Sequence, residues 1–309
     1  SIGSEIVRQV SSYKYKKLIL IDQSESPLYD LEQELILLNK TNFTAIVADV
    51  RGKSRMANIF KQYAPDIVFH AAAYKHVPLM EASPYESIKI NVNGTKILAD
   101  ISSRYNVKKF VFISTDKAVN PTSVMGATKR LAEMYISCLQ KESKTKFITT
   151  RFGNVLGSNG SVIPLFKKQI ENGGPLTLTH KDITRYFMTI SEASQLVLEA
   201  GTMGKGGEIF IFDMGDSVKI FNLALNMIKL SGLRYPEDID INITGLRPGE
   251  KLYEELLANG ENTLSTYHKK IMISKTRDEI DYNKTKSEIE ALCITNRFQN
   301  NNIVLKMKN

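Results

Sequence analysis

Short apolar, β-branched runs alternate with helix-like patterns through the first half of the chain. The runs predict strands at Lys17–Asp22, Phe43–Asp49, Asp66–Ala71, Lys109–Ser114 and Phe147–Thr150. The periodic stretches between them predict helices at Tyr29–Leu38, Lys53–Tyr63, Ser87–Arg104 and Ser123–Gln140. Because the runs are continuously apolar, we expect helices on both faces of the sheet. This alternation of strands and helices predicts a doubly wound parallel α/β sheet.

The pattern loosens after Arg151, where glycine-rich turns separate shorter elements and helices are predicted near Ser191–Ala200 and Ile220–Leu230. We therefore expect a first domain over residues 1–150 and a smaller C-terminal α/β lobe over residues 151–309, with some of its segments returning to the sheet. A helical pattern opens directly at Ser1. A doubly wound sheet needs a strand before it, so we expect the first strand and part of its glycine turn to be missing from these residues.

Charge narrows the choice of partner. The 309 residues carry a formal net charge of +8, which favours nucleic acid, an anionic membrane face or a phosphorylated ligand, with an ordinary mildly basic surface as the alternative. The lysines and arginines are scattered, without a run of five basic residues or an aromatic-rich surface. This pattern argues against a nucleic-acid partner.

Cysteine usage and hydropathy indicate the compartment. Cys138 and Cys293 lie far apart, with no Cys or His at metal-ligand spacing, so we predict neither a disulfide nor a metal site. No apolar run approaches the ~18 residues that span a bilayer. We expect a cytoplasmic domain. A membrane anchor upstream of Ser1, at the cytoplasmic face of the inner membrane, stays open as an alternative.

Two features near the start indicate a dinucleotide. Ser1-Ile2-Gly3 has the form of the end of a glycine-rich turn, whose last glycine lets a helix pack closely with its N-terminus facing a pyrophosphate. Asp22, nineteen residues further on, ends a strand where an acid accepts hydrogen bonds from the adenosine ribose hydroxyls. A carboxylate there repels a 2′-phosphate, so we predict NAD rather than NADP. A solvated Asp at a strand end is the alternative.

Other cofactor candidates share a place at the carboxyl end of a predicted strand, where open α/β sheets bind ligands: Asp49, Val50, Ala71, Ala72 and Ala73. The alanines would let a cofactor approach closely, although simple packing explains them equally well. Asn91, in the predicted helix Ser87–Arg104, joins the same set. We therefore interpret residues 1–150 as a Rossmann-type NAD-binding domain and the later lobe as substrate-binding.

The segment from Ser114 to Arg130 carries the chemistry. Thr115, Asp116 and Lys117 follow a strand end, which brings a hydroxyl, a carboxyl and an amine together at the crevice. Met125 and Lys129 are four residues apart on the next predicted helix and share one face. An isolated Asp-Lys pair is usually a solvated turn, but these neighbours favour a catalytic cluster.

This segment resembles the Ser/Thr-Tyr-x-x-x-Lys site of extended short-chain dehydrogenase/reductases. STDKAVNP (114–121) and MGATKR (125–130) are similar, more narrowly, to the polysaccharide-biosynthesis UDP-N-acetylglucosamine 4,6-dehydratases. Met125 replaces the usual Tyr, as in the long, membrane-anchored branch of that family. RFGNVLGS (151–158), TRYFMT (184–189) and GLRPGEK (245–251) extend the resemblance over nearly the whole chain.

The resemblance implies a NAD-dependent lyase that makes a UDP-2-acetamido-2,6-dideoxy-4-hexulose for bacterial surface polysaccharide or glycan synthesis. It implies Lys129 at the nicotinamide ribose and Thr115 at the sugar C4 hydroxyl. Lys117 is the expected base at C5, made partly neutral by burial or by Lys129, and Asp116 the expected acid at C6 and a candidate proton acceptor at C4. The roles of Asp116 and Lys117 are exchangeable.

UDP-N-acetylglucosamine is the expected partner, and we expect a homo-oligomer, dimer or higher. The substrate-binding candidates are Lys75, His76, Asn154, Arg185, Arg247 and Glu250. Arginines in the matching stretches, Arg151 included, suit bidentate pairing with a diphosphate, although surface salt bridges are an alternative.

Two rival functions remain at this point. A UDP-sugar 4-epimerase shares fold, cofactor and substrate class but needs no acid–base pair at C5 and C6, so Asp116 and Lys117 argue against it. A catalytically silent NAD-binding protein would explain Met125, but not the retained Lys129.

Overall fold

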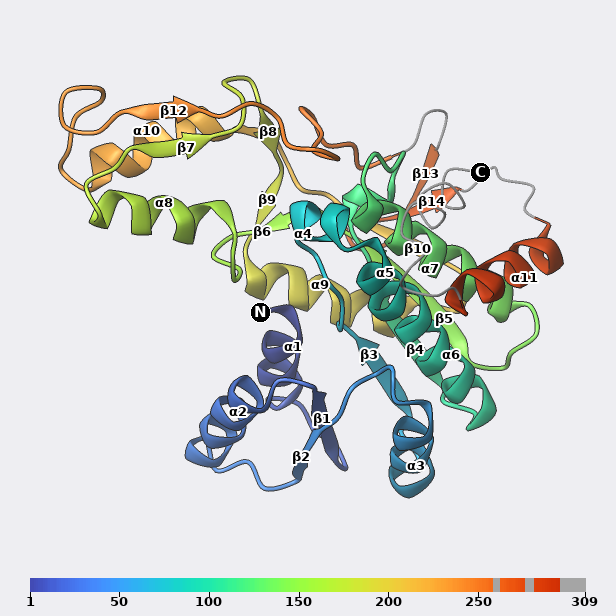
Figure 1. Ribbon diagram of the computed structural model, residues 1–309. Helices are drawn as coiled ribbons and strands as arrows, with labels where there is room; N and C mark the ends of the chain where they lie inside the picture. Colours follow the sequence, from blue (N-terminus) through green and yellow to red (C-terminus); the bar gives the residue numbers. More distant parts are fainter. Residues whose placement is uncertain (258–261, 276–280, 295–309) are drawn as a thin grey trace.

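The computed structural model describes residues 1–257, 262–275 and 281–294, and its centre is a sheet with the strand order β13-β14-β10-β5-β4-β3 (Figure 1). β3, β4, β5 and β10 run parallel, and β14 and β13 continue the sheet antiparallel. The α/β class with a parallel sheet is confirmed. The strands span Ile67–His70 (β3), Lys109–Ile113 (β4), Lys146–Arg151 (β5), Ile209–Phe212 (β10), Asn262–Ser265 (β13) and Ile271–Lys275 (β14).

A second parallel pair, β1 (Leu18–Asp22) and β2 (Phe43–Val47), lies apart from this sheet. Among the described residues no strand joins β1 to β3, and a cavity lined by both strands separates them. In a doubly wound sheet the first strand lies between the second and the fourth, which is this opening. The opening is where such a strand would fit. That it is missing from these residues stays a prediction.

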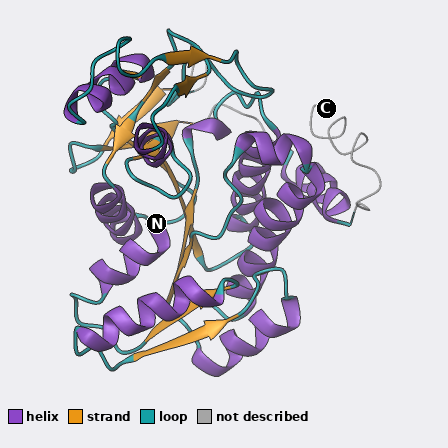
Figure 2. Ribbon diagram, turned by 60° about the vertical axis from the view of Figure 1, so that its left-hand side comes forward, coloured by secondary structure: helices purple, strands orange, loops and turns teal. Residues whose placement is uncertain are grey.

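Helices cover both faces of the six-stranded sheet (Figure 2). Phe110 and Phe112 of β4 point into one apolar layer, and Val111 between them points into the other. Both faces of the strand are therefore buried, which explains its continuous apolar run. The first layer contains α3 (Lys53–Tyr63), α6 (Thr95–Arg104), α7 (Val124–Gln140) and α11 (Tyr282–Cys293), and the second contains α1 (Ile2–Val10) and α9 (Ile190–Met203).

A smaller lobe follows the carboxyl end of β5, at the upper left of Figure 1. Its apolar core lies among two helices and a parallel strand pair: α8 (Val162–Glu171), α10 (Ile220–Leu230), β7 (Leu176–Leu178) and β12 (Ile241–Ile243). Two short pairs complete it: β6 (Asn154–Val155) with β9 (Phe187–Met188), and β8 (Thr184–Arg185) with β11 (Val218–Lys219).

Several helices differ from the prediction. The predicted helix Ser87–Arg104 begins as a π-helix, η1 (Ile88–Gly94), and continues as α6. Two short helices before it, α4 (Val77–Ala82) and α5 (Pro84–Ser87), give no helical signal in the sequence; each has a proline in its first turn, where the missing N–H breaks no helical hydrogen bond. α2 spans Glu25–Leu37 and so starts before the predicted Tyr29. No helix of the described ranges is long and apolar enough to cross a membrane.

Candidate active site

The predicted acid–base residues follow β4 directly. The Asp116 N–H donates to the Phe152 carbonyl at 3.1 Å, so the pairing of β4 with β5 extends past the strand ends. Thr115 caps the short 3-10 turn η2 (Asp116–Ala118), and its hydroxyl accepts from the Lys117 N–H at 3.4 Å. Backbone hydrogen bonds therefore fix the positions from which these side chains extend.

The Asp116 carboxylate is buried at the centre of this cluster. Its Oδ1 accepts from Thr115 Oγ1 at 2.9 Å and from Lys117 Nζ at 3.1 Å. Its Oδ2 is buried without a hydrogen-bond partner, next to Gly153, where a Cβ would lie 3.2 Å from that oxygen. Lys117 Nζ also donates to Asn154 Oδ1 at 3.3 Å. The structure thus brings four predicted site residues into one hydrogen-bonded group and leaves one carboxylate oxygen without a hydrogen-bond partner.

Lys117 has a second carboxylate partner, Glu254. The distance from Lys117 Nζ to Glu254 Oε1 is 3.1 Å, and the same oxygen lies 3.3 Å from Arg185 Nε. Burial alone would lower the pKa of Lys117, but Asp116 and Glu254 raise it above its ordinary value. The expectation that burial or Lys129 makes Lys117 partly neutral is therefore wrong while Lys117 contacts both carboxylates. Lys117 rests as an ammonium.

Met125 occupies the wall of the site without any polar function. It is 3% exposed and packs with Met80 and Val124, and it also lines the large cavity described below. At the next residue, Gly126, a Cβ would lie 2.2 Å from the Lys117 carbonyl. Only glycine lets α7 begin this close to the η2 turn.

Lys129 lies one turn further along α7. Its Nζ donates to the Ile113 carbonyl at 2.6 Å and lies 3.9 Å from the centre of the Phe112 ring. Burial lowers the pKa of Lys129 to about 7, and the nearby Glu133 only partly opposes this. The pKa of Lys129 is therefore lowered where that of Lys117 is raised.

A cavity of about 1270 Å³ extends from β1 to this cluster. The N-terminus of α1 offers N–H donors to phosphate, the Asp22 carboxylate offers an acceptor to ribose hydroxyls, and small side chains after β3 leave room for close approach. These groups fit a dinucleotide. The lining includes Ser1, Ile2, Gly3, Asp22, Val50, Ala71, Ala72, Ala73, Thr115, Lys117, Met125 and Lys129.

Two predicted cofactor residues lie away from this cavity. The Asp49 carboxylate hydrogen-bonds Arg51 at 2.6 Å, and this hydrogen bond lowers the pKa of Asp49. Asn91 is fully buried in η1; its amide accepts from the Tyr74 N–H and donates to the Tyr74 carbonyl and to Thr128 Oγ1. Because those hydrogen bonds use its amide internally, Asn91 supports the Tyr74 loop and does not face a cofactor.

The predicted substrate residues other than Asn154 gather around a smaller cavity of about 200 Å³, whereas Asn154 lines the large cavity. Arg185 is anchored there by the backbone, because its guanidinium donates to the Thr184 carbonyl at 2.7 Å and the Lys251 carbonyl at 2.8 Å. Arg247 is 56% exposed and contacts only Glu250, at 3.4 Å, among the ion pairs of the described residues. The lining includes Lys75, His76, Lys117, Arg185, Arg247, Glu250 and Glu254, and Lys75 lines the large cavity as well.

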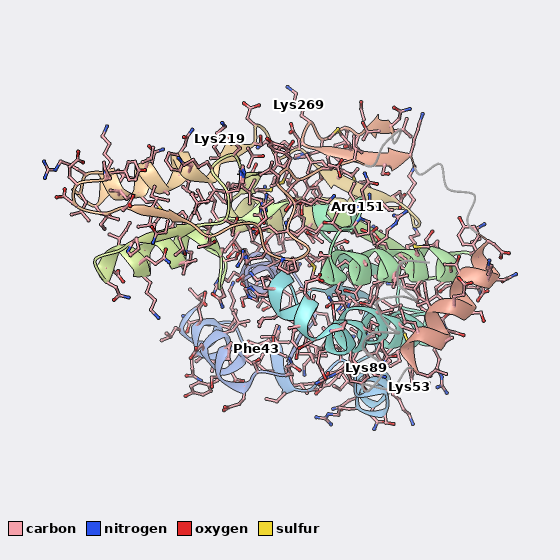
Figure 3. All side chains as sticks on the ribbon, turned by 45° about the horizontal axis from the view of Figure 1, so that its top comes forward. Phe43, Lys53, Lys89, Arg151, Lys219 and Lys269 are labelled. Atoms are coloured by element: carbon pink, nitrogen blue, oxygen red, sulfur yellow. The ribbon has the colours of Figure 1, made fainter. Side chains whose placement is uncertain are left out.

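Arg151 does not face substrate, contrary to the expectation for arginines in the matching stretches. It is 2% exposed and donates two hydrogen bonds to Glu133, at 2.8 and 2.7 Å. Glu133 also accepts from Ser114 Oγ at 2.6 Å. Figure 3 shows Arg151 among the packed elements and Lys219 at the periphery. The Arg151–Glu133 pair joins β5 to α7 and is structural.

The sequence interpretation missed Glu133 and Glu254. Glu133 lies four residues after Lys129 on one helix, so helical spacing could have placed it on the same face. Glu254 lies outside any helix or strand, and no pattern marks it. Within the described ranges no group of three or more His, Cys, Asp or Glu is arranged to hold a metal ion.

Known proteins match this chain over most of its length. Residues 1–276 match the family described as polysaccharide biosynthesis protein. The capsular polysaccharide biosynthesis protein CapD of Staphylococcus aureus is 51% identical over 313 residues, which cover all of this chain and 51% of that protein. The chain thus spans about half of that relative's length.

Two further matches have a named activity or a solved structure. A UDP-N-acetylglucosamine 4,6-dehydratase (inverting) of Campylobacter jejuni is 34% identical over 83% of this chain and 74% of its own. The X-ray structure of Pen from Bacillus thuringiensis superposes with a TM-score of 0.83 at 33% identity, covering 94% of each chain. As its motifs predict, the chain belongs to the polysaccharide biosynthesis protein family.

Proposed function

We propose that this chain carries the active site of a NAD-dependent dehydratase that converts UDP-N-acetylglucosamine to a UDP-2-acetamido-2,6-dideoxy-4-hexulose. The observation that carries the proposal is that Thr115 and Lys117 both donate to Asp116 Oδ1, on the wall of a cavity that Lys129 also lines. A group able to move protons at C5 and C6 thus lies beside a site that fits a nicotinamide. The similarity to the Campylobacter jejuni dehydratase supports the same substrate class.

When bound, NAD would accept a hydride from sugar C4 and return it to C6. Thr115 would hold the C4 hydroxyl and relay its proton to Asp116 Oδ1, to which the Thr115 hydroxyl already donates. This relay would substitute for the Tyr that Met125 replaces. Lys129, fixed by the Ile113 carbonyl, would hold the ribose hydroxyls.

Lys117 would serve the elimination twice. In one concerted step its ammonium would donate a proton to the C6 hydroxyl, which leaves as water, while the nitrogen lone pair that this frees accepts the C5 proton. Asp116 keeps the C4 hydroxyl proton until C5 is reprotonated, so both side chains regain their initial charge after one water has left. Lys117 thus keeps the predicted role of C5 base and also takes the C6 acid role from Asp116, because its resting charge favours a proton donor.

Proton NMR of the product made from UDP-N-acetylglucosamine tests the proposal. We expect a new C6 methyl signal, with deuterium at C5 when the solvent is D₂O. A 4-epimer with an intact C6 hydroxyl would establish the epimerase alternative, and unchanged substrate in the presence of bound NAD would indicate a silent NAD-binding protein.

A further inference from the structure

Glu254 links the lobe to the catalytic turn. Its side chain is 2% exposed, and its Oε1 lies within 3.1 Å of Lys117 Nζ and 3.3 Å of Arg185 Nε. Its Oε2 is buried without a hydrogen-bond partner. Because Asp116 Oδ1 is also 3.1 Å from Lys117 Nζ, the ammonium lies between two buried carboxylates.

Arg185 fixes Glu254 in turn. Its guanidinium donates to the carbonyls of Thr184 and Lys251, so it cannot follow the carboxylate if that moves. A chain of contacts therefore runs from the backbone through Arg185 and Glu254 to Lys117. Arg185 also lies 3.6 Å from Glu250, which in turn contacts Arg247, so three cations and three carboxylates balance in charge, which low-dielectric surroundings favour.

We propose that Glu254 is a positioning residue of the acid–base site, which holds the Lys117 side chain in one orientation and in its charged form until the C6 hydroxyl leaves. The inference rests on the proposed function and adds a residue to it. In the proposed cycle Asp116 becomes neutral when it takes the C4 hydroxyl proton. From that step on, Glu254 is the carboxylate that still faces the Lys117 ammonium.

The charge of Lys117 can be measured without NAD or substrate. Competitive acetylation over a pH series, read by mass spectrometry, gives the pH at which the Lys117 amine becomes reactive. E254Q keeps the shape and the acceptor oxygen but removes the charge, so the pKa of Lys117 should fall and its labelling midpoint should drop by about one pH unit or more. E255Q is the matched control, because Glu255 is the neighbouring residue and contacts Lys251 and Asn120 instead. Its labelling midpoint for Lys117 should equal that of the wild type.

Turnover supplies the second measurement. With NAD and UDP-N-acetylglucosamine, E254Q should eliminate water roughly tenfold to a hundredfold more slowly and accumulate reduced NAD, while the dissociation constant for UDP changes little. The alkaline limb of the pH–rate profile of E254Q should move to lower pH, because the Lys117 ammonium loses its proton at a lower pH than in the wild type. E254D keeps the charge and should restore most of the wild-type pH profile.

The outcomes separate this inference from the proposed function. A folded E254Q protein with an unchanged Lys117 labelling midpoint and a wild-type pH profile would overturn the role of Glu254, even if the wild type forms the dehydrated product. If E254Q does not fold, E254D is measured alone: a Lys117 labelling midpoint that falls by about one pH unit or more, although the carboxylate charge is kept, would overturn the role of Glu254 as well. The opposite result is also possible: the wild type forms no dehydrated product, yet the labelling midpoint of Lys117 is lower in E254Q than in the wild type. This result would refute the proposed function and leave the role of Glu254 intact.

Discussion

The two sides of the site are built differently. On the cofactor side, the sheet is open between β1 and β3, the cavity measures about 1270 Å³, and Ile67 at the start of β3 is 49% exposed. On the substrate side, the cavity measures about 200 Å³, and its cations Lys117, Arg185 and Arg247 already contact carboxylates of the chain. Part of the larger cavity is the opening between β1 and β3 where a first strand would fit, so only the rest of it is space for a ligand. The substrate side instead offers charges that a ligand must take from their present partners.

This difference has an energetic consequence. A ligand on the cofactor side gains binding free energy mostly from groups that have no internal partner, such as the N–H groups at the start of α1. A diphosphate on the substrate side must displace Glu250 from Arg247, so part of its attraction is offset by the contact that it breaks. The largest effects of mutation should therefore come from groups that move protons or lie buried, and smaller ones from exposed groups that only bind.

Lys117→Met should have the largest effect. It removes the proposed donor at C6 and acceptor at C5 but leaves Lys129 and its contact with Ile113 intact, so C4 oxidation should survive and elimination should slow by about 10²–10⁴-fold. In single turnover, absorbance of reduced NAD should build up without dehydrated product or deuterium at C5. Lys219→Met, at an exposed site, is the control. Normal dehydration by Lys117→Met would move the base role to Asp116.

Arg151→Met should affect stability more than chemistry. It removes the bidentate partner of the buried Glu133 and leaves it Arg130, at 3.2 Å, and the Ser114 hydroxyl, so the cost should lie below the ~3–5 kcal/mol of a buried pair whose remaining charge has no partner. Thermal unfolding of the variant should occur at a markedly lower temperature. Arg234→Met breaks an ion pair with Asp238 whose arginine is 73% exposed, and the melting temperature should hardly change. Equal shifts in both variants would contradict the assignment of Arg151 as structural.

Arg247 and Arg185, the two arginines that line the small cavity, should differ in effect: the first should matter for UDP binding and the second also for stability. Arg247→Ala should weaken UDP binding by roughly tenfold to a hundredfold, or about 1.5–3 kcal/mol, because this exposed side chain can turn to a diphosphate. Arg185→Ala should also lower the melting temperature, since Arg185 anchors Glu254 and two backbone carbonyls. Calorimetry with UDP and a thermal melt measure the two effects. An unchanged UDP dissociation constant in Arg247→Ala would make that arginine structural too.

The sequence predicts much of this comparison, and physical reasons explain what it misses. Periodicity locates the strands because burial on both faces leaves a continuous apolar run, as in β4. The order of residues at strand ends also brings Thr115, Asp116 and Lys117 together correctly. The charge of Lys117 could not be predicted, since Glu254 is 137 positions away in the sequence and only the folded lobe brings it near. Likewise, Asn91 and Arg151 are of residue types that bind ligands, but tertiary packing buries them.

Asp22→Asn should have the smallest effect of these substitutions, and it tests cofactor binding alone. Asp22 is exposed at the end of β1, where water screens its charge, so the hydrogen bonds that it would accept from ribose hydroxyls should contribute only about 0.5–1.5 kcal/mol. The variant should therefore bind NAD roughly threefold to tenfold more weakly. It should also narrow the preference for NAD over NADP, because the carboxylate no longer repels a 2′-phosphate. Asp30→Asn, an equal charge change on α2, is the control and should leave both dissociation constants unchanged. Tighter binding of NADP than of NAD by the wild type, measured by calorimetry, would show that Asp22 does not read the ribose.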